Sequence, residues 1–367
     1  MHLAKLTNCP WRILRSVVRR ESHPYQIFQI RKRSGGNRLI CAPHSILMRA
    51  QRWIHDKILL SPGALARLSS ASSAYAPGCS IISNAKRHVG AKWMVKLDIK
   101  DFFESVSERQ VYHVFKDLGY PSLLSFELAR MCTRVAPARA NGTLRPREYK
   151  WRWTNTARVA AAPHADIRDL GHLPQGAPSS GMLANLAFAP QDREIEKIAE
   201  EYGGEYSRYA DDIVISLGEV TKVDCERILS RVARVVTLAG YRVNHTKTRV
   251  YGPGSRKIVT GLVVNDNVPR LTRQYKDDLS LCLYHIGRHG LLSHMAVRHS
   301  VKPLGYLNHI VGKILFAHSV EPAFGRRCMM ELRSAMSSHR ELYSMIDELE
   351  LRRGGEAEFE SLHADIF

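Results

Sequence analysis

Two adjacent acids in front of an apolar strand constrain this chain more than any other feature of its sequence. Asp211 and Asp212 close the run Tyr209-Ala-Asp-Asp212, and the branched apolar residues 213–215 that follow predict a strand. Two carboxylates at this spacing repel each other, which raises the pKa of one of them unless a divalent cation lies between them. A turn that presents both carboxylates is therefore a candidate Mg²⁺ site, although an Asp-Asp pair taken alone is more often the acidic tip of a hairpin.

A third acid ends another strand. Asp98 closes the apolar run Trp93–Asp98, which itself predicts a strand. An acid in this position is often a helix N-cap, and Asp101, three residues on, is a candidate for that cap. Phosphoryl transfer by two metal ions, however, needs carboxylates from separate strand ends, and Asp98 with Asp211 and Asp212 would supply that set.

The charge of the chain points to a polyanionic partner. Fifty-four Lys and Arg against 35 Asp and Glu give a net charge of +19, which is more than solubility requires. The excess is concentrated in residues 1–60 and 131–160, whereas residues 341–367 are acidic. The sequence contains no signal-peptide core, no apolar stretch long enough to span a membrane and no dominant basic amphipathic helix, so nucleic acid is expected and a membrane is not. The seven cysteines are scattered without a Cys-x-x-Cys pair, which is typical of reduced cytosolic thiols.

Hydrophobic periodicity predicts an α+β chain with a helical C-terminal third. Ser34-Gly-Gly-Asn37 lies between alternating flanks and predicts a β-hairpin over residues 30–40. Ser107 and Gln110 have the spacing of a capping box. Residues 133–172 are only weakly periodic, which predicts an insertion with little regular structure. Helices are expected over residues 46–58, 107–118, 182–188, 225–239 and from 271 onward, with further strands near 250 and over 258–264.

In this order, the motifs of the chain resemble those of the reverse transcriptase domain over about residues 25–265. The matching motifs are Arg31–Pro43 with Gln51–Ile54, Leu97-Asp98 with Phe102-Phe103, Leu173–Ser180, Tyr209–Asp212, Asn244 with Lys247, and Gly261–Asn265. The resemblance implies a right-hand polymerase with fingers, a palm of antiparallel sheet and helices, and a helical thumb. The expected segments are N-terminal helices and fingers over 1–90, palm over 91–118 and 173–264, a fingers or basic insertion over 119–172, and thumb with acidic tail over 265–367.

The resemblance also implies a two-metal polymerisation site. Asp98, Asp211 and Asp212 are the expected catalytic acids and would bind two Mg²⁺ ions, for which Mn²⁺ would be a substitute. The backbone carbonyl of Ile99 is an expected further ligand.

Around this site the resemblance implies contacts to a deoxynucleoside triphosphate. Arginines on the hairpin would clamp the triphosphate, because a guanidinium binds phosphate in a bidentate manner. An aromatic ring five residues after Asp98 would exclude a 2′-hydroxyl as a steric gate. The expected nucleotide-binding residues are Arg31, Arg33, Arg38, Phe103, Gln175 and Lys247.

Two further signatures resemble those of bacterial retron reverse transcriptases. Asn84 and His88 match an Asn-Ala-x-x-His pattern, for which a local hydrogen bond in a loop is the plainer interpretation, and Val259-Thr-Gly261 matches a Val-Thr-Gly pattern. The resemblance implies a cytoplasmic bacterial enzyme. It would copy a cognate structured non-coding RNA, from an internal guanosine 2′-hydroxyl, into a branched RNA–DNA hybrid (msDNA), in anti-phage defence with a separate effector protein. The expected contacts to RNA or primer are Asn84, His88, Val259, Thr260 and Gly261.

The sequence also departs from the family pattern and leaves alternatives open. Gly181 stands where the family usually has proline, and Ala184 replaces a common serine. The basic insertion 133–172 carries aromatic residues suited to stacking on unpaired bases, but a solvated loop fits equally. The acidic tail after Glu341 would dock an effector or be a solvated helix end. Two other functions remain: a defence-associated reverse transcriptase without a branched product, and an RNA-binding scaffold for an effector.

Overall fold

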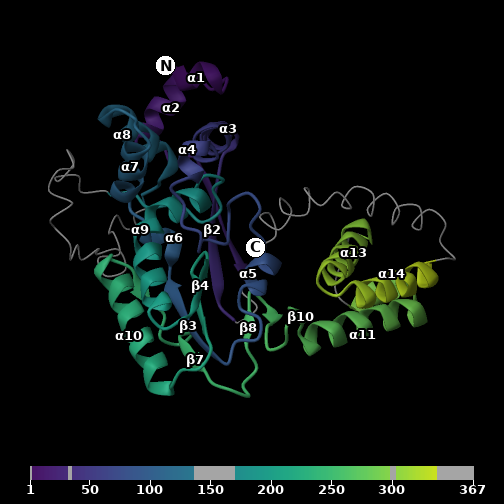
Figure 1. Cartoon of the computed structure of the whole chain (residues 1–367). Helices are drawn as coiled ribbons and strands as arrows, with labels where there is room; N and C mark the ends of the chain where they lie inside the picture. Colours follow the sequence, from purple (N-terminus) through teal and green to yellow (C-terminus); the bar gives the residue numbers. More distant parts are fainter. Residues whose placement is uncertain (1, 32–34, 136–169, 298–302, 337–367) are drawn as a thin grey trace. The chain divides into compact units, whose positions relative to one another are not determined.

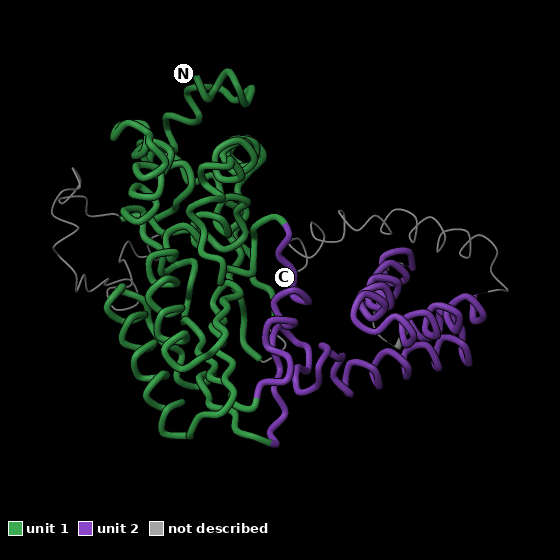
Figure 2. The backbone as a smooth tube through the Cα atoms, viewed as in Figure 1, with its two compact units in different colours: residues 1–77, 92–253 green, residues 78–91, 254–367 purple. Residues whose placement is uncertain are grey.

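The computed structural model describes residues 2–31, 35–135, 170–297 and 303–336 of the 367-residue chain. It divides into two compact units, which are described separately (Figure 2). Unit 1 comprises Met1–Pro77 and Lys92–Pro253, and unit 2 comprises Gly78–Ala91 and Gly254–Phe367. Most of the predicted insertion 133–172 and the whole of the acidic tail lie outside the described residues, as does Arg33.

Unit 1 is built on an antiparallel sheet that carries the predicted acids (Figure 1). The strands run in the order β4-β5-β3-β6, and β7 also pairs with β3. The two inner strands are almost wholly buried, as their branched apolar residues require. The strands are β3 (Trp93–Lys100), β4 (Glu205–Tyr209), β5 (Asp212–Leu217), β6 (Arg242–Val243) and β7 (Arg249–Tyr251).

Helices α9 and α10 contact each other and the sheet, so they cover one of its faces. Helix α9 (Ser180–Glu200) is much longer than the predicted residues 182–188, because it continues through Pro190 with Ile195 and Ile198 still buried in the core. Helix α10 (Lys222–Leu238) is capped by Thr221, and its C-cap Ala239 is followed by the left-handed Gly240, as predicted.

The helices that follow β3 pack against α9 or on one another. The predicted capping box is confirmed, because Ser107 and Gln110 bond each other's backbone at the start of α7. The residue predicted as a cap, Asp101, does occupy the N-cap of α6, but its carboxylate makes no capping bond and pairs with Arg242 instead. These helices are α6 (Phe102–Ser105), α7 (Glu108–Asp117) and α8 (Ser122–Cys132).

The N-terminal part of unit 1 contains the predicted hairpin between helices. Strands β1 (Tyr25–Arg31) and β2 (Asn37–Pro43) pair in antiparallel register, which confirms the hairpin. The helix predicted after Pro43 is also confirmed, although it ends in a π-helical turn. The helices are α1 (His2–Leu6), α2 (Trp11–Val18), α3 (Ser45–Ile54), the π-helical η1 (His55–Leu59) and α4 (Pro62–Leu65).

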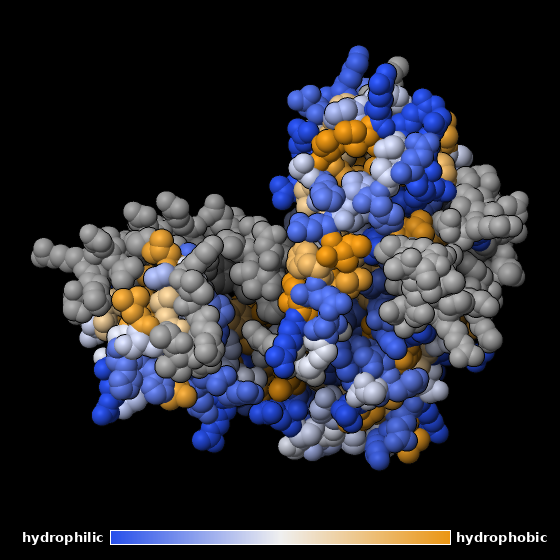
Figure 3. All heavy atoms as spheres, turned by 180° about the vertical axis from the view of Figure 1, so that it is seen from behind, coloured by the Kyte–Doolittle hydropathy of each residue, from blue (hydrophilic) through white to orange (hydrophobic). Residues whose placement is uncertain are grey.

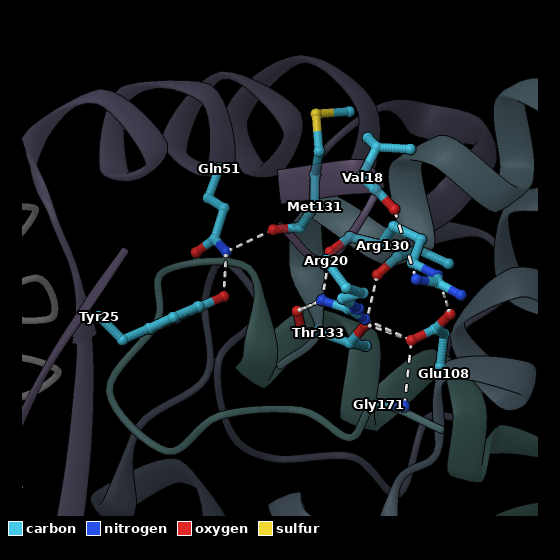
Figure 4. A network of polar contacts seen from close by, with 10 residues as sticks. Val18, Arg20, Tyr25, Gln51, Glu108, Arg130, Met131, Thr133 and Gly171 are labelled. Atoms are coloured by element: carbon cyan, nitrogen blue, oxygen red, sulfur yellow. Dashed lines mark hydrogen bonds and ion pairs between the residues drawn. The ribbon is translucent and has the colours of Figure 1, made fainter. Parts of the chain in front are cut away.

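A buried polar network joins the two described ends of the insertion to the core of unit 1 (Figure 4). The Glu108 carboxylate accepts hydrogen bonds from Arg20, from the Thr133 hydroxyl at 3.1 Å and from the Gly171 backbone N–H at 3.1 Å, and Arg130 pairs with it at 2.6 Å. A buried carboxylate surrounded in this way keeps its charge compensated. Residues Thr133 and Gly171 are therefore held close to each other by their bonds to the same carboxylate.

Unit 2 combines a short helix, a small sheet and a helical bundle. Helix α5 (Ile81–Lys86) contacts strands β8 (Ile258–Val259) and β9 (Leu262–Val263), and β10 (Arg270–Leu271) pairs with β9. The helices predicted after residue 271 are confirmed. They are α11 (Arg273–His289), α12 (Leu291–Val297), α13 (Pro303–Val320) and α14 (Pro322–Met336). Among the described helices of both units, none has the length and apolarity needed to cross a membrane.

Candidate active site

The three predicted acids come together at the ends of the two central strands of unit 1. Asp98 on β3 lies directly opposite Asp212 on β5, and antiparallel partners bring their side chains to one place. Asp211 lies in the turn between β4 and β5, and its carbonyl accepts a hydrogen bond from the Ile99 backbone N–H at 2.9 Å. The turn begins with Ala210, whose φ of 55° is left-handed and uncommon for a residue other than glycine.

The clustered carboxylates resist ionisation. Burial, and then the nearby Asp98, raise the pKa of Asp211 to about 6. Burial also raises the pKa of Asp212, although Lys96 acts in the opposite direction. This part of the site thus carries negative charge that is only partly compensated, which favours a bound cation.

Two lysines supply the positive charge that is present. The Lys247 ammonium donates to Asp98 Oδ2 at 2.7 Å, the Asn244 side-chain amide donates to Asp98 Oδ1 at 2.8 Å, and the Lys96 ammonium donates to Asp212 Oδ2 at 3.0 Å. Desolvation acts to lower the pKa of Lys247, but the hydrogen bond to Asp98 and the charges of the three acids together outweigh it, and the pKa is raised. Sequence reasoning assigned no role to Lys96, although Lys96 lies two residues before Asp98 and therefore on the same face of β3.

The oxygen donors of the site suit a hard divalent cation, but they are not arranged as a finished metal cage. Nowhere in the described part of the chain do three His, Cys, Asp or Glu side chains converge on one point as metal ligands. Asp98 and Asp212 are instead engaged by Lys247 and Lys96. A cation that binds here must compete with these two ammonium groups.

A buried ion pair holds the turn that carries Asp211, and sequence reasoning missed this pair. Arg208 and Asp192 are both completely buried, and they form two parallel hydrogen bonds of 2.8 and 2.7 Å. Arg208 Nη1 also donates to the Ala210 carbonyl at 3.0 Å and to Asn185 Oδ1 at 3.1 Å. Desolvation acts to lower the pKa of Arg208, but Asp192 raises it above its ordinary value. The left-handed turn is thus fixed by a charged side chain inside the core.

Besides Lys247, the predicted nucleotide-binding residues that the structure describes lie on the hairpin of β1 and β2, in the Leu173–Ser180 motif and on α6. Arg38 is half-buried on β2 and Arg31 is exposed at the end of β1. The carbonyl of Gln175 accepts a hydrogen bond from the Cys41 backbone N–H at 2.7 Å, which fastens the Leu173–Ser180 motif to the hairpin. Phe103 is partly buried on α6.

The hairpin also exposes apolar side chains on both of its faces. Alternate residues of a strand point to opposite faces, so Ile27 and Leu39 share one face and Phe28 and Ile30 share the other. All four are at least 40% exposed. On the side of the molecule drawn in Figure 3, apolar patches likewise interrupt a largely hydrophilic surface of unit 1.

The residues of the two further signatures meet in unit 2. Asn84 and His88 are fully buried, and Asn84 lies on helix α5 rather than in the expected loop. Neither polar atom of the Asn84 side chain has a hydrogen-bond partner among the described residues. Thr260 and Gly261 form the turn between β8 and β9 with φ of 45° and 85°, and the Thr260 hydroxyl donates to the Ile81 carbonyl on α5 at 2.8 Å. The two signatures therefore form one packed element.

Comparison with protein families accounts for this arrangement. The family model for reverse transcriptase (RNA-dependent DNA polymerase) matches residues 30–306, which is most of the chain and includes every acid of the site. The chain therefore belongs to the reverse transcriptase family and has its mixed fold of helices and antiparallel sheets.

Among known proteins, the chain is similar to retron reverse transcriptases. It is 31% identical to the retron Mx162 reverse transcriptase of Myxococcus xanthus over 84% of this chain and 60% of that protein. It is 34% identical to the retron Mx65 reverse transcriptase of the same organism over 72% of this chain and 56% of that protein. It is 29% identical to the retron Ec86 reverse transcriptase of Escherichia coli over 77% of each. The chain thus spans less than two thirds of the length of the first two relatives.

Solved structures show a weaker likeness. A telomerase from Candida albicans in complex with a fragment of telomeric RNA matches 95% of this chain and 69% of its own, with a TM-score of 0.44 and 12% identity. A likeness at this level adds nothing to the family assignment.

Proposed function

We propose that this protein is an RNA-directed DNA polymerase with a single active site at Asp98, Asp211 and Asp212. The observation that carries the proposal is the placement of Asp98 opposite Asp212 on adjacent strands, next to Asp211 in the turn, with lysines paired to two of these acids. The raised pKa of Asp211 supports it, because such a cluster is stabilised by cations. Asp98, Asp211 and Asp212, with the Ile99 carbonyl, would hold two Mg²⁺ or Mn²⁺ ions.

When bound, these ions supply the Lewis acidity that activates the primer hydroxyl and stabilises the departing pyrophosphate. The protein's own part is positioning. Arg208 holds the turn, Lys247 moves from Asp98 to the triphosphate, and Lys96 stays beside Asp212. Arg31 and Arg38 clamp the triphosphate from the hairpin, together with Arg33 beyond the described residues.

In this proposal the units take the roles of a right-hand polymerase. The hairpin and N-terminal helices act as fingers, the sheet of unit 1 as palm, and helices α11–α14 as thumb. Phe103 selects deoxynucleotides as a steric gate, and Gln175 contacts the nucleotide and template.

We further propose that the template is one cognate structured RNA, copied from an internal guanosine 2′-hydroxyl into branched msDNA in anti-phage defence. The similarity to retron reverse transcriptases supports this, as does the packed element formed by helix α5 and the Thr260-Gly261 turn. A cytoplasmic bacterial location, the RNA contacts of Asn84, His88 and Val259, and an effector partner belong to the same proposal. The high positive charge suits the RNA.

The test is to extract nucleic acid from the protein purified after expression from its native locus. A branched single-stranded DNA attached to RNA is expected from the wild type and should be absent from Asp211→Ala/Asp212→Ala. Polymerase activity on an added template without any branched product would instead favour a defence-associated enzyme of another type. Tight RNA binding without polymerisation would favour a scaffold.

A further inference from the structure

Tyr75 has a backbone conformation that its own side chain disfavours. Its φ is 60°, in the left-handed region that bulky residues rarely adopt. Such a conformation persists only where the surrounding structure holds it, and it is found most often at functional sites.

The chain around Tyr75 is fastened to the strand that leads into the catalytic turn. The Ser73 backbone N–H donates to the Arg208 carbonyl at 2.9 Å, and the Arg208 N–H donates to the Ala71 carbonyl at 2.8 Å. The Asn185 amide donates to the Ala74 carbonyl at 2.6 Å. Tyr75 is therefore held in a fixed position relative to Asp211, two residues beyond the end of β4.

The ring of Tyr75 occupies a space that only glycine at position 181 leaves open. A Cβ atom added to Gly181 would lie 2.5 Å from Tyr75 Cγ and 2.7 Å from Cδ1, which is closer than real Cβ atoms approach. Gly181 stands where the family pattern usually has proline, and any side chain at position 181 would meet the Tyr75 ring at its first atom. The departure from the pattern and the strained tyrosine are thus two parts of one packing arrangement.

From this position the Tyr75 ring contacts the predicted steric gate. The rings of Tyr75 and Phe103 lie edge to face, with centroids 5.8 Å apart and an interplanar angle of 66°. Tyr75 remains 42% accessible, and both a catalytic acid and a hairpin arginine act on its hydroxyl: desolvation and then Asp211 raise its pKa, while Arg38 lowers it. Tyr75 thus lies among the gate, a catalytic acid and a hairpin arginine, where an incoming nucleotide can reach it.

We propose that Tyr75 is a specificity-determining residue that holds the Phe103 ring in place, so that the two rings together form the wall met by the sugar of the incoming nucleotide. This inference rests on the proposed polymerase function and on Phe103 as the gate. With Tyr75 in place the Phe103 ring cannot move aside for a 2′-hydroxyl, and Gly181 is required because it makes room for Tyr75.

The test is single-nucleotide incorporation by the full chain with its RNA, comparing kcat/KM for a deoxynucleotide and the matching ribonucleotide. Tyr75→Gly removes the ring and suits the left-handed backbone, so folding should be retained. Tyr75→Phe keeps the ring and removes the hydroxyl. Tyr202→Ala is the matched control, because it also removes a tyrosine ring. Tyr202 lies just after the C-terminal end of α9, whereas Gly181 is in the first turn of that helix, about 30 Å away.

We expect Tyr75→Gly to lower the deoxynucleotide preference about threefold to tenfold, as the loss of one aromatic pair implies. Gly181→Ala should lower the preference in the same direction, because it displaces the ring. Tyr75→Phe and Tyr202→Ala should stay within about twofold of the wild type. An unchanged preference in Tyr75→Gly, alongside a lowered one in Phe103→Ala, would overturn the inference and leave the polymerase proposal intact. Failure of the wild type to incorporate any deoxynucleotide would overturn the polymerase proposal, and this inference with it.

Discussion

Arg208 and Asp192 form a completely buried bidentate ion pair next to the turn that carries Asp211, and the same guanidinium donates a hydrogen bond to the Ala210 carbonyl. Phe188 and Phe102 pack against this guanidinium at 4.7 and 5.5 Å from their ring centroids. Breaking a buried pair leaves an uncompensated charge in the core. Stability and turn geometry therefore depend on the same two side chains.

Asp192→Asn should destabilise unit 1 by about 3–5 kcal/mol, because Arg208 would remain buried without its counter-charge. Arg208→Lys keeps the charge but loses the bidentate geometry and the bond to Ala210. At temperatures where Arg208→Lys is still folded, its kcat should fall about a hundredfold, since a small displacement of Asp211 misplaces the reacting groups. Denaturant unfolding and primer-extension kinetics measure the two effects.

The matched control is the pair formed by Arg231 and Glu201, which is also bidentate but exposed. Arg231→Lys should leave the stability almost unchanged, because exposed pairs are screened by solvent. Equal effects at Arg208 and Arg231 would contradict the account of the buried pair.

Lys247→Ala should separate metal binding from nucleotide binding. Without the ammonium that pairs with Asp98, the Mg²⁺ concentration for half-maximal activity should fall several-fold, since a competing cation is gone. The KM for deoxynucleotides should rise about tenfold, because a contact to phosphate is lost. Lys92→Ala is the control. Lys92 is an exposed lysine paired with Glu219, and it precedes the first residue of β3, whereas Asp98 lies near the last. An unchanged Mg²⁺ requirement in Lys247→Ala would argue against competition at Asp98.

Acid should weaken unit 1 through His172, the last residue of the predicted insertion. Burial, against the hydrogen bond to the Leu173 carbonyl and with a smaller effect of the Arg134 charge, lowers the pKa of His172 to about 4. The unfolded chain therefore binds a proton that the folded chain rejects, so this contribution is present above pH 6.5 and is lost as pH falls toward 4. The full effect is about 3 kcal/mol. His172→Gln should flatten the stability profile between these pH values, whereas the exposed His289→Gln should keep the wild-type slope.

Thr260 should tie the turn of unit 2 to helix α5 through its hydroxyl. Thr260→Val keeps the branched side chain but removes the bond to Ile81, which should cost about 1 kcal/mol. Thr260→Asn should cost less, because asparagine tolerates a left-handed backbone in such turns. Hydrogen exchange of the Val259 and Leu262 amides reads out this local stability. Wild-type exchange rates in Thr260→Val would contradict the role assigned to the hydroxyl.

The sequence predicted those parts of the site that follow from local rules. Asp98, Asp211 and Asp212 were predictable because each comes at the end of an apolar strand, and antiparallel strands bring such ends together. Arg208 was not, because its partner Asp192 lies on a helix that the sequence pattern ended too early, before Pro190. A proline usually ends a helix, but the apolar face continues beyond it and packing overrides the local signal.

Tertiary contacts also explain two residues whose surroundings differ from the sequence-based expectation. Asp101 occupies the N-cap of α6 but pairs with Arg242 from another strand. Asn84 is a buried residue of a helix rather than of a loop, because helix α5 packs on β8 and β9. No rule based on neighbouring residues alone contains these long-range contacts.

The most direct test of the central claim is RNA-templated primer extension with deoxynucleotides and Mg²⁺, comparing the wild type with Asp98→Asn, Asp211→Asn and Asp212→Asn. The wild type is expected to extend the primer, and the extension rate should fall by at least about a hundredfold in each variant. The control Asp56→Asn, which changes an exposed acid outside the site, should retain extension. Extension that survives in the three variants, or a wild type that extends no primer with either Mg²⁺ or Mn²⁺, would contradict the account.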